Sequence, residues 1–447
     1  MTLNIDFILA IPVVRKCLLL LNRFTGWPLF FTFSIIGIVF SFAFRSRLAE
    51  LPYQFGIEAI ALFMPPFLAT VFAAIMGLKN GFTGKLLAFT IVLFFIQLLP
   101  VTDLLFRVIA PNPGEDFARN LAYAQNMIEQ KTLWGGDQIA YPEEGKEFVT
   151  QPGYRYYLAF QLFCFKHLYR FIGVLNSLLF VIALFWFMKA IVVTVEQKLF
   201  RILLVCLVAS TVLYATKNIL MGLNEWLMIL CLLLSVYYYK VKSNEILAVV
   251  FLALVVFVRQ NALLSVMLMF FWMFYNSKNK ILSLTFFSLT LLLPVYHNLY
   301  YAGKLQFFVS IHQWPFLKYV STSKLTPAHA VNYMNVLNNV FHYLGFHVRN
   351  TGVIDFIEEG FFFLLAFPVI VFYIQKKFFL GLHRFYYLAT VALMVGPTVF
   401  LGTHFYPRFE FVCFYFGIAA FVLFISTSKE RFPLTEWRLF NKRETIP

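Results

Sequence analysis

The stretch that decides the fold runs from Pro111 to Tyr157 and reads PNPGEDFARNLAYAQNMIEQKTLWGGDQIAYPEEGKEFVTQPGYRYY. It is polar and acidic, with five Glu and two Asp of the 21 acidic residues of the chain. Long apolar runs lie on both sides of it, roughly at 85–109 and 172–190. A polar stretch held between such runs is typical of a water-exposed loop between membrane spans. The chain is therefore predicted to be an apolar scaffold that carries this loop.

The composition of the whole chain indicates a polytopic membrane protein. Of the 447 residues, 61% are hydrophobic and only 13% are charged, whereas about a quarter are charged in soluble domains. The net charge of +15 comes largely from Lys and Arg in short links between apolar runs. Such links orient spans and contact lipid headgroups. Nucleic acid is therefore not expected as a partner, whereas membrane lipid is.

Hydropathy predicts an all-α protein of about twelve spans, since about 20 apolar residues cross the hydrocarbon core as a helix. The predicted spans are 28–44, 56–77, 85–109, 172–190, 200–216, 218–239, 245–257, 261–275, 281–300, 360–375, 384–402 and 409–426. The spans 245–257 and 261–275 are short and meet at Arg259, so this hairpin is expected to line a cavity rather than face lipid throughout. The five cysteines lie in or beside apolar segments without any CxxC pair, which indicates no disulfide framework.

The basic residues predict the orientation of the spans. The C-terminal tail 427–447 and the links around 79–85, 198–201, 240–242, 278–280 and 376–384 are basic and are expected to be cytoplasmic. The N-terminus, which lacks a signal-peptide cleavage site, is expected there too. The polar stretches 110–171 and 301–359 then share the external face, and Arg45 and Arg47 are exceptions to the pattern. This parity requires that 154–168 be an interfacial or re-entrant helix; a full crossing is the alternative and would invert several loops.

Glu115 and Asp116 follow the turn Pro-Asn-Pro-Gly and open a predicted helix from Phe117 to Lys131. Acids in a first helical turn have a structural explanation, because they complement the helix dipole. They also have a functional one: a carboxylate at the mouth of a span can act as a general base. The sequence alone leaves both explanations open.

Several motifs together resemble the GT-C glycosyltransferases, the class that includes protein O-mannosyltransferases and the lipid A aminoarabinose transferase. The loop opens with the acidic pair, continues in a helix with Ala122 and Ala124, and returns to the membrane through Gln151–Tyr157. The segment Lys217–Glu225 resembles the polar segment of the family, Arg259-Gln260-Asn261 its hairpin with one basic residue, and His404–Phe409 its Arg-Tyr motif. The resemblance covers about residues 85–426.

The sequence departs from the family in three respects. The family usually has Asp first in its acidic pair, often with Tyr four residues later, whereas here the order is Glu115-Asp116 and residue 120 is Asn. Ala124 lies eight residues after Asp116, which matches the family spacing better than counting from Glu115 does. Two additional spans in 1–84 precede the core 85–426, and a large soluble C-terminal domain is not expected.

The resemblance implies the roles of particular residues. Asp116 is expected to be the catalytic base with Glu115 as helper, although the two are exchangeable. The carrier phosphate would be held by Arg408, Arg259 and Lys217, because Arg matches phosphate oxygens with a planar fork. The substrate pocket would include Glu225, Tyr154, Arg155, His404 and Tyr406. Each basic residue also has a structural explanation: ion pairing of Lys217 with Glu225, a structural pair for Arg259, and headgroup contact for Arg408.

The implied function is transfer of a sugar from a polyprenyl-phosphate donor to a glycan, lipid or protein acceptor at the external face. The expected location is a bacterial inner membrane with the site facing the periplasm. No metal site is expected from the histidines at 312, 329, 342, 347 and 404, since no HxxxH or HExxH spacing occurs; a divalent cation stays open as a cofactor. The alternatives are an O-antigen ligase or polymerase and a lipid-linked glycan flippase or transporter.

Overall fold

The computed structural model describes residues 26–43, 60–101, 115–129, 152–165, 172–194, 212, 215–216, 219, 222–259, 262–302 and 305. Within these residues the regular structure is entirely helical, without strands. The elements are α3 (Trp27–Ala43), α5 (Ile60–Asn80), α6 (Gly84–Leu98), η2 (Leu99–Val101), α8 (Glu115–Glu129), α9 (Pro152–Phe165), α10 (Ile172–Thr194), α12 (Glu225–Lys240), α13 (Glu245–Val258), α14 (Leu263–Tyr275), α15 (Lys280–Leu291) and α16 (Leu293–Ala302).

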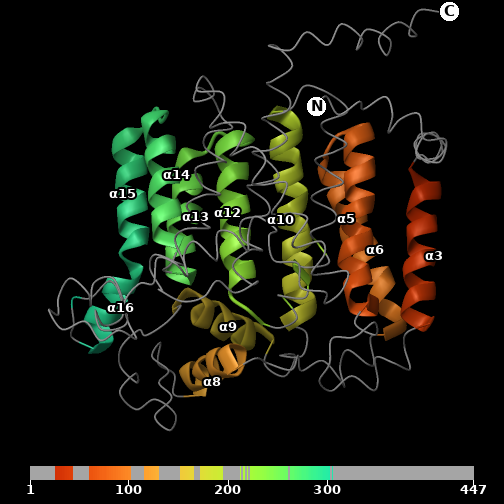
Figure 1. Ribbon diagram of the computed structural model, residues 1–447, viewed down its shortest axis with the longest axis horizontal. Coiled ribbons are helices and arrows are strands. Elements are labelled where there is room, and N and C mark those ends of the chain that lie inside the picture. The colour runs from red at the N-terminus through yellow and green to blue at the C-terminus, as the bar shows by residue number, and fades with distance from the viewer. Residues whose placement is uncertain are drawn as a thin grey trace, which may run out of the picture.

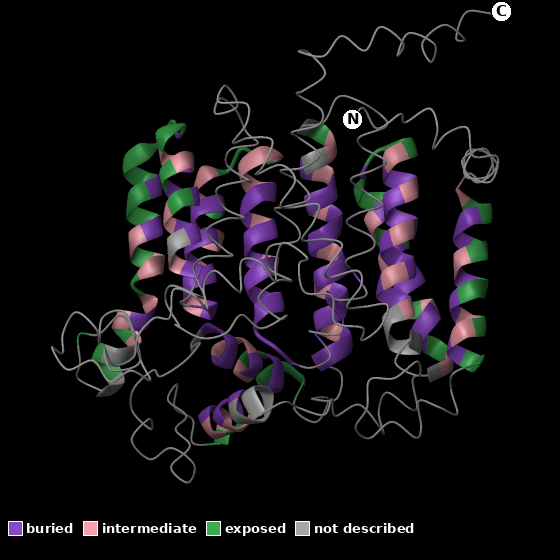
Figure 2. Ribbon diagram, in the orientation of Figure 1, coloured by how far each residue is buried: buried purple, intermediate pink, exposed green. Residues whose placement is uncertain are grey.

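Most of these helices stand side by side, and α8, α9 and α16 lie at one end of them (Figure 1). The upright helices are α3, α5, α6, α10, α12, α13, α14 and α15, and α8, α9 and α16 lie beneath them in the view of Figure 1. Helices α10, α12 and α13 form the centre and are the most thoroughly buried (Figure 2). We call the end that carries α8, α9 and α16 the α9 end, and the opposite end the lysine end.

The lysine end contains the turns from α5 to α6, from α12 to α13 and from α14 to α15. Six lysines lie in or beside these turns: Lys79, Lys85, Lys240, Lys242, Lys278 and Lys280. These are the links that the sequence predicted to share one face. The start of α8, the start of α12 and the end of α13 lie at the α9 end instead, so the two groups of segments are separated by the length of the helices.

Two predicted spans differ from the helices that form. The expected helix 281–300 is broken at Leu292 into α15 and α16, because Pro294 lacks an amide hydrogen and its ring clashes with the preceding turn. The expected span 218–239 begins as α12 only at Glu225. Before Glu225, Gly222 has a φ of +66°. This backbone conformation is not helical and favours glycine.

The expected span 85–109 is also shorter in regular helix. Helix α6 ends at Leu98 and gives way to the 3-10 turn η2, which contains Pro100. The other expected spans within the described residues correspond to α3, α5, α10, α13 and α14 with small shifts at their ends. Most of 200–216 and all of 360–375, 384–402 and 409–426 lie outside the described residues, as do the loop 301–359 except at its start and the tail 427–447.

One described helix, α10, is both long and apolar enough to cross a bilayer, with a mean hydropathy of 2.0 over Ile172–Ala190. Five further apolar helices are shorter, between 10 and 17 residues: Trp27–Ala43, Gly84–Leu98, Glu245–Val258, Ser265–Tyr275 and Lys280–Leu291. The number of spans in the whole chain therefore stays a prediction.

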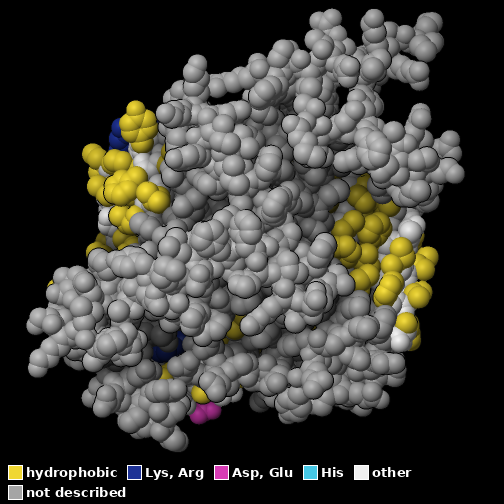
Figure 3. Space-filling view, in the orientation of Figure 1, with side chains coloured by type: hydrophobic (Ala, Val, Ile, Leu, Met, Phe, Trp, Pro, Cys, Tyr) yellow, Lys and Arg dark blue, Asp and Glu magenta, His cyan; other side chains and the backbone are white. Residues whose placement is uncertain are grey.

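The outermost helices expose many large apolar side chains, although Leu29 and Phe30 of α3 and Phe287 of α15 are buried. In α3 the buried residues include Ser34, Gly37 and Ser41, whereas five large side chains of the same helix are more than half exposed: Trp27, Phe31, Ile35, Val39 and Phe42. In α15, Ser283 is fully buried and Ile281 is 83% exposed. Figure 3 shows hydrophobic side chains gathered on the surface over α14 and α15 on the left and over α3 and its neighbours on the right.

Candidate functional site

Helix α9 brings four consecutive side chains to the ends of the upright helices. The Tyr154 hydroxyl donates to the backbone oxygen of Gly222 at 2.9 Å, just before α12. The Tyr157 hydroxyl donates to Asn176 Oδ1 of α10 at 2.7 Å, and the Tyr156 hydroxyl is hydrogen-bonded to the ring of His297 on α16. The Tyr-Arg-Tyr-Tyr run therefore connects α9 to three other helices at the α9 end.

The close approach of α9 depends on a glycine. A Cβ at Gly153 would lie 2.9 Å from the backbone oxygen of Phe257, at the end of α13, which is closer than side-chain atoms tolerate. The first turn of α9 thus lies directly against the last turn of α13. This contact sets α9 beneath the turn that carries Arg259, where Tyr154 reaches the segment before α12 and the Tyr156 ring stacks on Phe257 of α13.

A buried ion pair lies at the centre of this end. Arg259 follows α13 in an extended conformation, and its Nη2 is 3.0 Å from Oε1 of Glu225, the first residue of α12; the two side chains are 5% and 0% exposed. Arg259 Nη1 also donates to Asn224 Oδ1 at 3.2 Å. A buried charge is costly unless it is paired, so this pair fixes the start of α12 against the end of α13.

Two buried hydrogen-bond donors lie beside this ion pair. Within the described part of the chain, the side-chain nitrogen of Asn224 is buried without a hydrogen-bond partner, whereas the indole nitrogen of Trp226 lies beside the Tyr154 hydroxyl. An unpaired buried donor such as that of Asn224 is rare in folded proteins because leaving it unpaired is unfavourable.

Arg155 links α9 to α8. It is 8% exposed, its Nε lies 3.5 Å from Asn120 Oδ1, and its guanidinium carbon is 3.8 Å from the centre of the Tyr123 ring. A guanidinium over an aromatic face gains a cation–π attraction. Arg155, expected in the substrate pocket, therefore holds the two crossing helices together.

Burial determines the protonation states in α9. It raises the pKa of Tyr154 and of Tyr157 well above the usual value for tyrosine, so both are neutral hydroxyl donors. Burial, followed by the nearby charge of Arg155, lowers the pKa of His297 to about 3. His297 is thus a neutral imidazole at physiological pH. None of these three groups is suited to gain or lose a proton near pH 7.

Glu115 and Asp116 form the first turn of α8, close to the start at Phe117 that the sequence predicted. The buried stripe of α8 consists of Asn120, Tyr123, Ala124 and Met127. Residues spaced by three or four share a helix face. Position 116, one turn before Asn120, is therefore in register with the buried stripe, whereas position 115 is in register with the half-buried residues 122 and 126.

The structure brings some of the expected site residues together and leaves others undescribed. Tyr154, Arg155, Glu225 and Arg259 lie at the α9 end. Four expected residues lie outside the described residues: Lys217, His404, Tyr406 and Arg408. In the described ranges no group of three His, Cys, Asp or Glu side chains is placed to hold a metal ion.

Sequence reasoning missed a set of neutral polar residues that complete this end. They are Asn120, Gln161, Asn176, Asn224 and His297. Gln161 Nε2 donates to Asn176 Oδ1 at 2.8 Å, inside the α9–α10 contact. The signal was present, since polar residues within apolar segments usually have partners or face a cavity, but only ionisable residues were singled out.

Comparison with protein-family models, with curated proteins and with solved structures finds no significant match.

Proposed function

We propose that this chain is an integral membrane protein that crosses the bilayer several times. The support is the surface of α3 and α15, which expose many large apolar side chains outward while small residues such as Gly37 and Ser283 are buried between helices. Soluble proteins rarely expose contiguous apolar surfaces of this kind, whereas membrane helices associate through small residues and expose apolar ones to lipid. The lysine end would face the cytoplasm, because basic links are retained there.

Within this framework we propose a glycosyltransferase of the GT-C type, with its site at the α9 end and facing the exterior. The single observation that supports it best is the gathering of three predicted motifs at one end: α8 with its acidic first turn, the Tyr-Arg run of α9, and the Glu225–Arg259 pair. The first two motifs belong to one loop, whereas Glu225 and Arg259 come from helices much later in the sequence. An active site requires residues from several segments to meet, whereas a loop that only covers the helix ends does not.

The reaction proposed is an inverting sugar transfer. An acceptor hydroxyl or amine would attack the anomeric carbon of the donor, its proton would pass to the Asp116 carboxylate, and the bond to the carrier phosphate would break. The polyprenyl phosphate would leave with the bonding electron pair. The register of Asp116 with the buried stripe of α8 favours it over Glu115 as the base, since that stripe faces the Tyr-Arg run of α9.

Arg259 has a narrower role in this proposal than the sequence implied. Its guanidinium is already held by Glu225 and Asn224, so Arg259 would act chiefly by fixing the start of α12. The unpaired side-chain nitrogen of Asn224 would then donate to the carrier phosphate or the sugar. Arg408 and Lys217 remain the proposed cations for the phosphate, where they would stabilise the charge that develops on the leaving group.

The test is mass spectrometry of cell-envelope glycolipids and glycoproteins from cells with and without the gene, followed by complementation with variants. Asp116→Asn should lower product formation by about 10²–10⁴-fold, the contribution of a general base, and Glu115→Gln by much less. Glu129→Gln is the matched control, because Glu129 is the exposed acid at the other end of the same helix.

The outcomes separate the rival functions. Full activity of Asp116→Asn would contradict the proposed base and favour an O-antigen ligase or polymerase, which relies on Arg and His. Movement of a lipid-linked glycan across the membrane without a new covalent product would indicate a flippase or transporter.

A further inference from the structure

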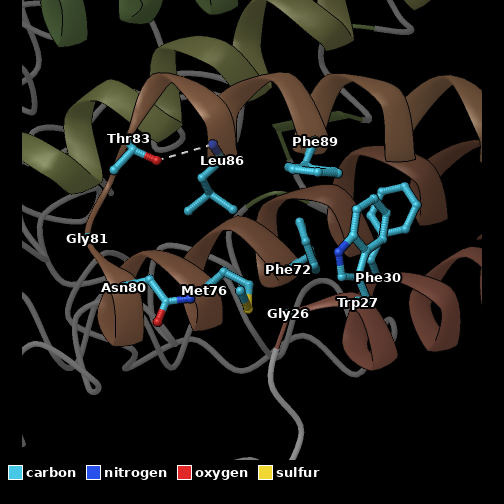
Figure 4. A pocket seen from close by; sticks show the side chains of 10 residues that line it. All are labelled: Gly26, Trp27, Phe30, Phe72, Met76, Asn80, Gly81, Thr83, Leu86 and Phe89. Atoms are coloured by element: carbon cyan, nitrogen blue, oxygen red, sulfur yellow. Dashed lines mark hydrogen bonds between the residues drawn. The ribbon is translucent and has the colours of Figure 1, made fainter.

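A cavity of about 190 Å³ opens at the lysine end, far from the proposed active site. It lies between the starts of α3 and α6 and the end of α5 (Figure 4). The lining residues are Gly26, Trp27, Phe30, Phe72, Met76, Asn80, Gly81, Thr83, Leu86 and Phe89. Figure 4 shows the rings of Trp27, Phe30, Phe72 and Phe89 gathered at one side and Asn80 near the turn at the other.

The lining is suited to a hydrocarbon ligand rather than to water. Four aromatic rings are in mutual edge contact, with centroids 5.1 Å apart for Trp27 and Phe89 and 5.9 Å for Phe30 and Phe72. The Thr83 hydroxyl is engaged as the cap of α6, where it accepts from the amide of Leu86. A cavity of about 150 Å³ with apolar walls stays dry and binds benzene, so this one has room for a chain segment of roughly six carbons.

The two halves of α3 contact its neighbours in different ways, and the cavity lies beside the half with the larger side chains. A Cβ at Gly37 would lie 2.3 Å from the Gln97 side chain, and the Ser41 hydroxyl donates to the backbone oxygen of Gln97 at 2.9 Å. These contacts hold the second half of α3 tightly against α6. Toward the lysine end large rings replace these small residues, and the helices separate around the cavity.

The rim of the cavity is rigid. The turn between α5 and α6 is fixed by Phe82, whose ring lies where a Cβ at Gly77 would be and makes edge contact with Phe185 of α10 at 5.2 Å. The neighbouring Gly81 has φ of +82° and open space beside it. A preformed opening of this kind binds a ligand without the cost of ordering a loop.

We propose that this cavity binds one acyl chain of an anionic phospholipid from the leaflet at the lysine end. Charge complementarity selects the headgroup: the exposed Lys79 and Lys85 flank the opening in sequence, adjacent to the lining residues Asn80 and Leu86. Lysines near a membrane surface attract anionic lipid headgroups. The inference rests on the membrane insertion proposed above and is independent of sugar transfer.

The test is photolabelling of the full chain in nanodiscs with a phospholipid that carries a diazirine in its acyl chain, with peptides mapped by mass spectrometry. We expect label on peptides from α3 and from the end of α5, more from an anionic than from a zwitterionic phospholipid. Leu86→Trp, which fills the cavity, should remove most of this label. Phe95→Trp is the control, since Phe95 is on the same helix, 47% exposed and outside the cavity.

A second variant and a competition experiment with unlabelled lipid test the same proposal. Lys85→Gln should abolish the preference for the anionic phospholipid while labelling of the cavity continues. Unlabelled anionic phospholipid should reduce the label in the unaltered chain, a measurement that holds even if Leu86→Trp does not fold. Equal labelling of the Leu86→Trp and Phe95→Trp variants would overturn the proposal.

Labelling of the exposed apolar face of α15 distinguishes failure of the proposed lipid site from failure of the proposed membrane insertion. Label on α15 without label at the cavity would refute the lipid site and leave membrane insertion intact. Absence of label from both would refute membrane insertion itself, and with it the basis of the proposed function.

Discussion

Removal of one partner of the Glu225–Arg259 pair should be strongly destabilising. Both side chains are almost completely buried and their charged atoms are 3.0 Å apart. Glu225→Gln would leave the guanidinium buried without its counter-charge, and Arg259→Gln would do the same to the carboxylate. Breaking a buried pair in this way typically costs about 3–5 kcal/mol. Each single variant should therefore unfold at a clearly lower temperature than the unaltered chain.

The double variant Glu225→Gln/Arg259→Gln provides the decisive comparison. It places two neutral amides side by side and leaves no buried charge, so it should lose no more than about 2 kcal/mol. If the two sites were independent, the single losses would add to about 6–10 kcal/mol. Recovery in the double variant would thus measure the coupling directly.

The assay is thermal unfolding of the four proteins in the same detergent or nanodisc. Additive losses in the double variant would refute the pairing. So would a loss below about 1 kcal/mol for either single variant, since that is the range of exposed ion pairs. Arg259 would then be available for a ligand phosphate, as the sequence first suggested.

Two further predictions concern packing and pH. Gly77→Ala should destabilise the chain by about 1–3 kcal/mol through overpacking, because its Cβ would meet the Phe82 ring at 2.4 Å. The control Gly84→Ala has open space at its Cβ and should be nearly neutral. Equal melting temperatures for the two variants would contradict this prediction. Burial lowers the pKa of His297 to about 3, so between pH 6.5 and 3 the unfolded chain binds a proton that the folded chain does not, and stability should fall as the pH is lowered through this range. His297→Gln should show a flatter dependence of melting temperature on pH, and identical profiles would refute the assignment.

The helices of this fold were largely predictable from hydropathy, because a long apolar run away from water can satisfy its own backbone groups by forming a helix. The grouping of the lysine links at one end followed from the same reasoning. The exceptions come from local backbone chemistry. Pro294 divides a run that hydropathy predicts to be one span, and Gly222 precedes the start of α12 within another predicted span.

The site was less predictable than the fold. Arg259 and Glu225 were each recognised as costly in an apolar segment, yet their pairing with one another depends on α12 and α13 being neighbours, which hydropathy does not encode. Asn120 was noted only as a departure from the Tyr expected there, whereas its contact with Arg155 gives it a positioning role. The sequence identified the charged residues of this end but not the residues that they contact.

The way α3 packs has a consequence for how the protein unfolds. The contact of Gly37 and Ser41 with Gln97 removes little apolar surface from water, so the hydrophobic effect adds little to the attachment of this half of α3. The other half buries Leu29 and Phe30, and there the hydrophobic effect does contribute. The two halves should therefore differ in strength when water reaches them: during unfolding in denaturant the half with Gly37 and Ser41 should separate before the half with Leu29 and Phe30.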